Sequence, residues 1–410
     1  MAERLWEGKN KVAVVGVGMS QIGRMLPRPL GVLAVDASLK AIADAGLTVA
    51  DIDGLAGPEE GHDPGVASAP FMWMVEGLGV EHLNWWSHSN SISVTLGSAI
   101  NAIANNLCNY ALVWVAVRQP RSGGFGAGRQ SRMQTDGPPK AYTLQEQFGY
   151  PFGLGDGELT RYAPAYMRYM QLSGAKREHL GTYSLVARAG ANNNPNAMFY
   201  EQQLTMDDYM NCRMVADPLC LFDCDMPIDG AVAVVLARAD IAKDMRQPPA
   251  YITAYGSAGW HWAHLLPDCS TEYTIDYSAG NTARTLWAST DLTQKDMDGA
   301  FFFDGFGSNI YFFAEAFGFA PKYEAWQWIQ DGRIALGGEL PINTHGGNLS
   351  EGRLGSLNHW VEATKQIQKR ADNQPGDGAR QIQGVENVLC VAMLGLGGRP
   401  TGVVLSSEPR

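Results

Sequence analysis

Apolar residues follow two alternating patterns along this chain, short continuous runs and longer segments with helical spacing. The runs are rich in β-branched residues and typical of buried parallel strands; they occupy 11–18, 109–117 and 230–238. Helical spacing extends over 30–46, which stops at a glycine, and over 91–107, which is rich in small residues. The pattern therefore predicts an α/β chain in which strands and helices alternate.

The second half of the chain repeats a motif of the first. Leu-Thr-x-x-Asp-[Ile/Met]-Asp-Gly occurs at 47–54 and again at 292–299, and each copy leads from a helix into a predicted strand. Because the order of elements around the two copies also matches, we expect two duplicated halves, 1–245 and 246–410. A long loop insertion in the first half, about 118–215, is expected to cover a site or shape an interface.

Composition narrows the class of protein. The 410 residues are 45% hydrophobic and 18% charged, which allows a buried core and argues against disorder. The net charge is −11 without a basic cluster, so we expect no nucleic-acid partner. No apolar run approaches about 18 residues, so no membrane span is expected, and the charged N-terminus predicts a cytoplasmic protein. The six cysteines form no CxxC pair, so no metal site is expected.

Three segments carry a family resemblance. They read ADPLCLFDCDMPIDGAVAVVLA (216–237), LPINTHGGNLSEGRLGSLNHWVEATKQI (340–367) and LGLGGRPTGVVLSS (394–407), in this order. They resemble the end of the first half, the Gly-Gly loop and the C-terminal hairpin of thiolases of the sterol carrier protein-x (lipid-transfer protein) type. The resemblance implies the α/β thiolase fold, in which two duplicated halves form five layers, αβαβα, and it implies a homodimer core.

The catalytic positions of a thiolase are replaced in this chain. The resemblance places the nucleophilic cysteine at the start of the 91–107 helix, where Ser89 stands and no cysteine occurs. The histidine of the His-Asp-Cys-Phe motif is replaced by Phe303, and the histidine of the Gly-His-Pro motif by Arg353. The C-terminal cysteine base of a thiolase is also missing, since the matching stretch 392–395 reads Ala-Met-Leu-Gly. Cys390 is nearby, but it is two or more residues out of register with that position. These replacements argue against Claisen condensation and thiolysis.

The chain looks more like the steroid side-chain retro-aldolases, which lack the thiolase cysteine. That resemblance implies cleavage of a bulky steroid or aromatic 3-hydroxyacyl-CoA without a covalent intermediate, with no cofactor other than the CoA of the substrate. It also implies a small zinc-ribbon/OB-fold partner protein. In that group tyrosines replace the two histidines, and this chain departs from them at Phe303 and Arg353.

Retro-aldol chemistry needs a base for the β-hydroxyl proton and donors that stabilise the enolate. His345 is the first candidate base and Asp304 the second, Arg353 is the candidate enolate stabiliser, and Ser89 occupies the nucleophile position. The predicted substrate-binding residues are Ser91, Phe303, Gly346, Gly347, Gly397 and Gly398.

Other roles are open for the same residues. The structural alternatives are a turn hydrogen bond for His345, helix caps for Ser89, Ser91 and Asp304 (the last for a helix beginning at 305–308), and for Arg353 a pairing with Glu351 or Asp304. The whole chain could instead be a non-catalytic thiolase-like subunit of a hetero-oligomer. A third alternative is an atypical acyltransferase that uses Ser89 or a displaced cysteine.

Overall fold

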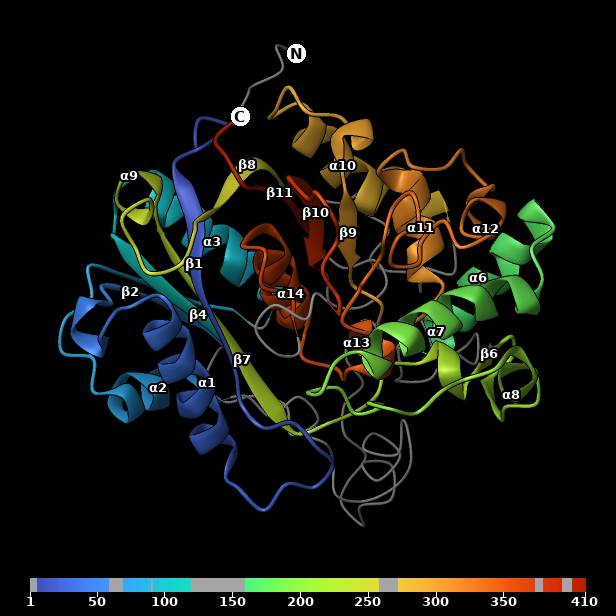
Figure 1. Cartoon of the computed structure of the whole chain (residues 1–410), viewed down its shortest axis with the longest axis horizontal. Helices are drawn as coiled ribbons and strands as arrows, with labels where there is room; N and C mark the ends of the chain where they lie inside the picture. The colour runs from blue at the N-terminus through green and yellow to red at the C-terminus, as the bar shows by residue number, and fades with distance from the viewer. Residues whose placement is uncertain are drawn as a thin grey trace, which may run out of the picture.

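The computed structural model of the chain describes residues 6–58, 69–89, 91–118, 159–257, 272–372, 379–392 and 400–410. Strands and helices alternate through both halves (Figure 1). The strands are β1 (Val12–Met19), β2 (Gly54–Gly57), β3 (Trp85–His88), β4 (Tyr110–Val117), β5 (Met214–Ala216), β6 (Leu219–Cys220), β7 (Gly230–Arg238), β8 (Ala250–Ser257), β9 (Gly299–Phe302), β10 (Asn387–Ala392) and β11 (Thr401–Ser406).

Two helices, α1 and α3, follow the predicted segments 30–46 and 91–107 with small changes at their ends. The helices are α1 (Leu30–Asp44), α2 (Phe71–Leu78), α3 (Ile92–Ala104), α6 (Leu159–Ser173), α7 (Arg177–Asn192), α8 (Met206–Met210), α9 (Ala239–Ala242), α10 (Ala279–Trp287), α11 (Asn309–Ala316), α12 (Ala325–Trp328), α13 (Gly347–Ser350) and α14 (Leu357–Ile367). Gly46 has a φ of 80°, so it ends α1 as the sequence predicts. None of the described helices is long and apolar enough to cross a membrane.

One sheet joins the two halves. Its strand order is β3-β2-β4-β7-β1-β8-β11-β10-β9, and the antiparallel pair β1–β8 lies in the middle. Read outward from this pair, β1-β7-β4-β2 has the same arrangement as β8-β11-β10-β9. The predicted division at 245/246 falls in the connection between α9 and β8; that the halves are separate domains stays a prediction.

The repeated motif has the same geometry in both halves. The threonine donates through its backbone N–H and its hydroxyl to the first aspartate, over 2.7 and 2.8 Å in both Thr48–Asp51 and Thr293–Asp296. The second aspartate of each copy accepts backbone N–H groups at the start of the neighbouring strand, β4 or β10. The motif that is repeated in the sequence therefore forms the same local structure in both halves.

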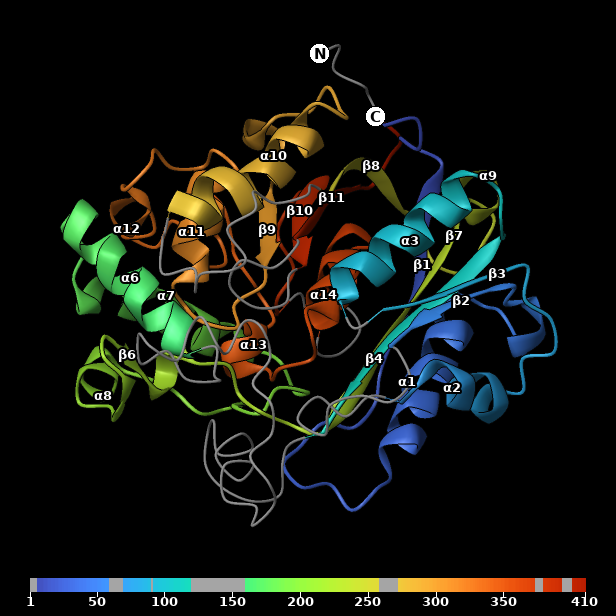
Figure 2. The same cartoon turned by 180° about the vertical axis from the view of Figure 1, so that it is seen from behind.

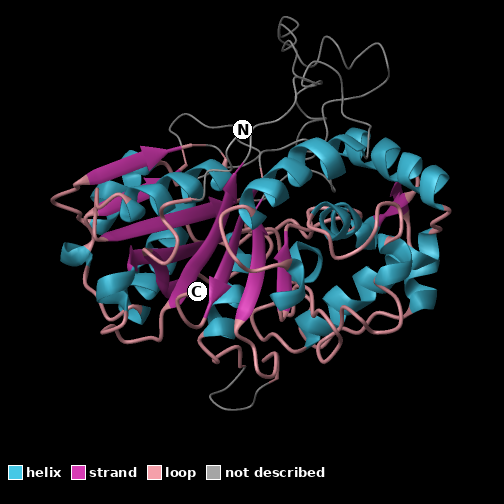
Figure 3. Ribbon diagram, turned by 90° about the horizontal axis from the view of Figure 1, so that it is seen from above, coloured by secondary structure: helices cyan, strands magenta, loops and turns pink. Residues whose placement is uncertain are grey.

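Helices cover both faces of the sheet and fill its centre. α1 packs on β1, β4 and β7, while α10 packs on β8 and β11 and α11 on β9. The helices α3 and α14 lie between the part of the sheet from the first half and the part from the second half. Each of them contacts strands of both halves (Figure 2). Figure 3 shows the strands running through the molecule with helices on either side. This is the predicted five-layered αβαβα arrangement, and the fold class is confirmed.

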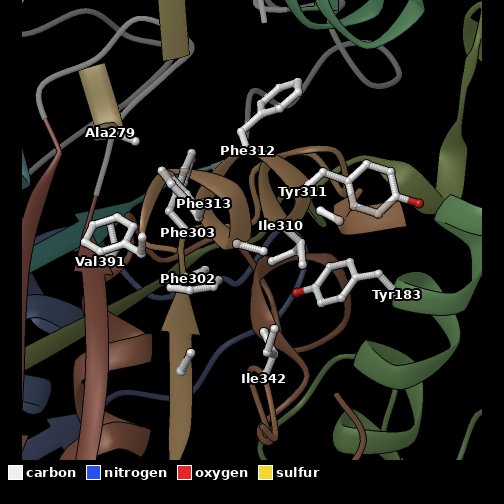
Figure 4. Close-up of a cluster of buried hydrophobic side chains, with 14 of the residues drawn as sticks. Tyr183, Ala279, Phe302, Phe303, Ile310, Tyr311, Phe312, Phe313, Ile342 and Val391 are labelled. Atoms are coloured by element: carbon white, nitrogen blue, oxygen red, sulfur yellow. The ribbon is translucent and has the colours of Figure 1, made fainter. Parts of the chain in front are cut away.

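The described part of the insertion lies against the second half. Tyrosines at 162, 166 and 169 of α6 share one buried cluster with Tyr311 and Phe312 of α11. Tyr183 of α7 reaches toward Phe302 in the same cluster (Figure 4). The insertion therefore joins the halves near the ends of β9 and β10.

Candidate functional site

The two halves meet where the parallel strands end. Ser89, just after β3, donates its N–H to Gly57 O at the end of β2 (3.0 Å). Ser93 of α3 donates its hydroxyl to Ala392 O at the end of β10 (2.9 Å), and Phe303 N–H donates to Val391 O. The start of α3 and the loop after β9 therefore lie at one edge of the sheet, where α/β folds commonly place their sites.

Ser89 and Ser91 shape the turn into α3. Ser91 occupies the N-cap position but its side chain makes no capping hydrogen bond, whereas Ser89 Oγ accepts the N–H of Ser91 (3.2 Å). Within the described residues, neither hydroxyl contacts a histidine or a carboxylate. A serine nucleophile needs such a base, so this position lacks the activation that acyl transfer requires.

The Gly-Gly loop is compressed between α7 and Asp304. Gly346 has a φ of 105° and Gly347 a φ of 59°, values that side-chain-bearing residues rarely adopt. A Cβ on Gly346 would lie 2.7 Å from Ala191 Cβ in α7, and one on Gly347 would lie 2.1 Å from Asp304 Oδ2. The pair of glycines therefore lets the loop approach both neighbours.

Asp304 is completely buried and contacts three segments through hydrogen bonds. Tyr183 Oη (2.6 Å) and Asn348 N–H (2.7 Å) donate to its carboxyl, and His359 Nε2 lies 3.0 Å from Oδ1. The predicted cap for a helix beginning at 305–308 is wrong, because Asp304 caps α13, on the far side of the loop, and α11 begins only at Asn309. Its carboxylate ties the β9 end to the Gly-Gly loop.

His345 is enclosed beneath the loop, with 1% of its surface exposed. Its Nε2 lies 3.6 Å from Glu351 Oε2 and 3.5 Å from Asn358 Nδ2, while Nδ1 makes no hydrogen bond. The ring meets that of His359 edge-on at 4.9 Å between centroids. Burial, then the charges of neighbouring cations, hold the pKa of His345 well below its usual range, so the ring is neutral near pH 7.

Glu351 is the carboxyl next to that ring. Its two oxygens accept from Asn194 Nδ2 (2.8 Å) and Asn358 Nδ2 (2.9 Å). Burial raises the pKa of Glu351 to about 7, although these two hydrogen bonds lower it. The predicted site therefore contains a buried carboxyl that changes charge near neutral pH.

Replacing Glu351 by glutamine is expected to change the pH dependence of unfolding. The folded chain keeps a proton there that the unfolded chain releases above its ordinary pKa of 4.5, so this contribution to stability is present below pH 4.5 and lost as the pH rises through about 7. Between these limits, the free energy of unfolding of the wild type should fall relative to Glu351→Gln by about 3 kcal/mol. Urea unfolding across this pH range measures it, with the exposed Glu339→Gln as control. Parallel pH profiles for Glu351→Gln and wild type would contradict the buried, protonated carboxyl.

Arg353 is the most exposed of the predicted catalytic residues in the loop, with 35% of its side chain accessible. Its N–H donates to Met226 O (2.8 Å), and its Nη1 lies 3.7 Å from Asp225 Oδ1. The predicted pairing with Glu351 or Asp304 is wrong: the carboxylate beside the guanidinium comes from the segment before β7. Gly355 lies over Val115 near the end of β4, so this part of the loop covers the first half's edge of the sheet.

The other predicted residues fall in different places. Phe303 is 5% exposed and packs in the buried cluster of the second half (Figure 4). Gly397 and Gly398 lie outside the described residues. Cys390 is buried in β10 on the face toward the central helices, and burial holds its thiol pKa well above the usual range. The described residues contain no group of three side chains arranged to hold a metal ion.

Several residues of the site were not identified from the sequence. They form the hydrogen-bond network around Asp304 and Glu351 and are Tyr183, Asn194, Asn343, Asn358 and His359. A signal exists for Asn358 and His359, because the segment that forms α14 begins Leu-Asn-His-Trp, with polar residues among large apolar ones. Tyr183 in α7, Asn194 just after it and Asn343 carry no such signal, since only the fold brings them to Asp304 or Glu351.

Similarity to known proteins covers nearly the whole chain. A model of the thiolase C-terminal domain-like family matches residues 261–407. The chain is 32% identical over 409 residues to the 17-hydroxy-3-oxo-4-pregnene-20-carboxyl-CoA lyase of Mycobacterium tuberculosis. The matched region covers 96% of this chain and 99% of that relative. It is 31% identical over 405 residues to the steroid side-chain-cleaving aldolase of Thermomonospora curvata, covering 97% and 98% of the two chains.

A solved structure agrees with these relatives. The Ltp2-ChsH2(DUF35) aldolase matches with a TM-score of 0.82 and 30% identity, covering 97% of this chain and 98% of that one. Similarity at this level covers almost the full length and therefore extends to both halves.

Proposed function

This chain belongs to the thiolase superfamily, in the branch of the steroid side-chain-cleaving aldolases, and is a carbon–carbon lyase rather than a standard thiolase; from that premise we propose that it cleaves a bulky 3-hydroxyacyl-CoA by a retro-aldol reaction. The proposed acyl group is a steroid or aromatic side chain. The reaction needs no cofactor beyond the CoA of the substrate.

The observation that carries the proposal is the absence of an activated thiol at the start of α3. That turn presents Ser89 and Ser91 instead, and neither contacts a base within the described residues. Of the five cysteines that the structure describes, four are buried, and burial raises the pKa of each thiol, to about 12 for Cys108 and Cys220. A covalent acyl intermediate on any of these four buried thiols is therefore disfavoured, which supports cleavage without one.

The chemistry divides into a proton step and a charge-stabilising step. A base takes the β-hydroxyl proton, the oxygen becomes a ketone or aldehyde carbonyl, and the bond between Cα and Cβ breaks. Its electron pair forms the enolate of the thioester, which a proton converts to the shorter acyl-CoA. The partly exposed Arg353 guanidinium is proposed to stabilise the enolate oxygen, because it carries a permanent charge in a partly desolvated loop.

His345 is the proposed base. Its lowered pKa keeps the ring neutral, and its Nδ1 is not engaged in a hydrogen bond. Because the ring is enclosed, the β-hydroxyl has to enter beneath the Gly-Gly loop to reach it. Ser89 lies at the end of β2 in the first half and is proposed to contact the substrate rather than attack it.

A partner subunit is part of the proposal. The similar solved structure is of the Ltp2-ChsH2(DUF35) aldolase, whose name joins two components. We propose that this chain forms a homodimer core that works with a small protein containing a zinc ribbon and an OB-fold, in the cytoplasm.

The test is a product assay. The chain, alone and with a co-encoded small partner, is incubated with 17-hydroxy-3-oxo-4-pregnene-20-carboxyl-CoA, the compound for which the M. tuberculosis relative is named. Release of a steroid ketone with a shorter acyl-CoA is expected. If a panel of steroid and aromatic 3-hydroxyacyl-CoA thioesters is neither bound nor cleaved by the complex, the lyase proposal is wrong and a non-catalytic subunit is favoured.

A further inference from the structure

We propose that His359 is a positioning residue held as a doubly protonated cation, whose ion pair with Asp304 fixes the Gly-Gly loop. Both side chains are completely buried, and His359 Nε2 lies 3.0 Å from Asp304 Oδ1. The argument counts donors and acceptors around the pair, because each buried polar atom needs a complementary partner.

The partner of His359 Nδ1 is an acceptor. That nitrogen lies 3.1 Å from the side-chain oxygen of Asn358. The amide of Asn358 is oriented by its nitrogen, which donates to Glu351 Oε2 (2.9 Å) and faces Gly352 O (3.5 Å). Reversing the amide would turn its oxygen toward the carbonyl of Gly352, which has no hydrogen to donate in any charge state of Glu351. His359 Nδ1 therefore carries a hydrogen.

The partner of His359 Nε2 is an acceptor as well. Asp304 Oδ1 also accepts Asn348 N–H (2.7 Å), and Oδ2 accepts the hydroxyl of Tyr183 (2.6 Å). Leu349 N–H, 3.4 Å from Oδ2, is a third donor to the carboxyl. Three donors other than the imidazole stabilise the negative charge of the ionised form, so we assign the proton of the Asp304–His359 contact to His359 Nε2.

The direction of the Tyr183 hydrogen bond supports this assignment. Its oxygen receives Asn343 Nδ2 (2.7 Å), so its own hydrogen is directed to Asp304. Asn343 is oriented by both backbone groups of Phe302: its oxygen accepts the N–H and its nitrogen donates to the C=O, each over 2.9 Å. The backbone of Phe302 in β9 therefore fixes the orientation of Asn343, and Asn343 in turn fixes the direction in which Tyr183 donates.

The resulting state is a buried imidazolium–carboxylate pair. The titratable side chains around His359 in the described contacts are Asp304, Tyr183 behind it, and His345 and Glu351 from the two ends of the Gly-Gly loop. The neutral His345 ring beside it avoids a second buried cation, and His359 is a cause of the lowered pKa of His345. Removing one member of such a pair leaves the other charge without compensation.

The pair gives Asp304 a positioning role instead of the role of a base. Its oxygens are occupied by donors, and they hold the N–H groups of Asn348 and Leu349 at the start of α13, shortly before Arg353. Loss of His359 should let this loop relax and misplace the guanidinium. This effect on turnover rests on the proposed function, whereas the charge state of His359 does not.

The charge state is tested by ¹⁵N NMR of histidine-labelled protein at about pH 7.5. Ordinary histidines are then mostly neutral, because their usual pKa is about 6.5. We expect one histidine with both ring nitrogens protonated and its Nδ1–H protected from exchange, assigned to His359 in the wild type by through-bond correlation and by its loss in His359→Gln. A His359 ring with only one protonated nitrogen overturns the proposal.

The positioning role is tested by kinetics. His359→Gln is expected to lower kcat at least 10-fold with KM changed less than about 3-fold, since the binding surface stays and the loop geometry changes. Thr364→Val, a buried α14 residue whose hydroxyl makes no hydrogen bond, is the matched control and should leave kcat unchanged. Full kcat in a folded His359→Gln overturns the positioning role. If the wild type cleaves no 3-hydroxyacyl-CoA, the proposed function fails while the NMR result still decides the charge state.

Discussion

Arg353→Ala is expected to lower kcat for aldol cleavage by about 100- to 1,000-fold, the usual effect of removing one preorganised group that stabilises developing negative charge. Arg353 is the partly exposed cation of the Gly-Gly loop, and its backbone is anchored to Met226. The substitution should therefore remove the charge without moving the loop. Steady-state kinetics with the substrate of the product assay measure the effect.

Two variants separate charge from shape at this position. Arg353→Lys keeps a positive charge but loses the planar fork, so it should recover part of the lost kcat. Arg333→Ala removes an arginine with similar exposure that pairs with Glu339 instead, and it should leave kcat unchanged. Turnover of Arg353→Ala within about 3-fold of the wild type would show that Arg353 does not stabilise the transition state.

Gly347→Ala is expected to lower the free energy of unfolding by about 3 kcal/mol, from left-handed backbone strain and overpacking together. A Cβ at this position would lie 2.1 Å from Asp304 Oδ2, so the carboxylate would have to leave the N–H groups of α13. The same shift should abolish most of the turnover. Urea unfolding and kinetics measure the two effects.

Gly79→Ala is the matched control for this substitution. Gly79 also has a positive φ, 69°, but a Cβ there would meet nothing within 4 Å. Gly79→Ala should therefore lower the free energy of unfolding only by the cost of a left-handed backbone, about 1 kcal/mol. Equal losses for the two variants would show that the contact between Gly347 and Asp304 is not tight in solution.

Much of the fold follows from local patterns in the sequence. The apolar runs became β1, β4 and β7 within one or two residues, because strands buried on both faces read as continuous hydrophobic segments. The repeated Thr-x-x-Asp motif is equally local, since its hydrogen bonds span three residues. Which strands pair across the halves is a long-range property that was not predicted; the family resemblance, rather than periodicity, predicted the layered arrangement of the two halves.

The candidate site was predictable only in part. The Gly-Gly loop, Asp304 and Arg353 stand in recognisable motifs, so the sequence identified them. Their partners did not follow, because hydrogen bonds such as Tyr183–Asp304 and His359–Asp304 join residues 121 and 55 positions apart. The same reason explains the wrong partners: Asp304 was expected to cap the helix that follows it, and Arg353 to pair with a carboxylate of the recognised motifs, whereas the fold supplied α13 and Asp225.

The central claim, carbon–carbon cleavage through an enolate without an acyl-enzyme, is tested most directly by running the reaction in D₂O without free CoA. Retro-aldol cleavage places one solvent deuterium on Cα of the shorter acyl-CoA, so that product should be one mass unit heavier. The intact mass of the chain should stay unchanged throughout the turnover. Cleavage that depends on added CoA, together with an acyl adduct on the chain, would contradict the account.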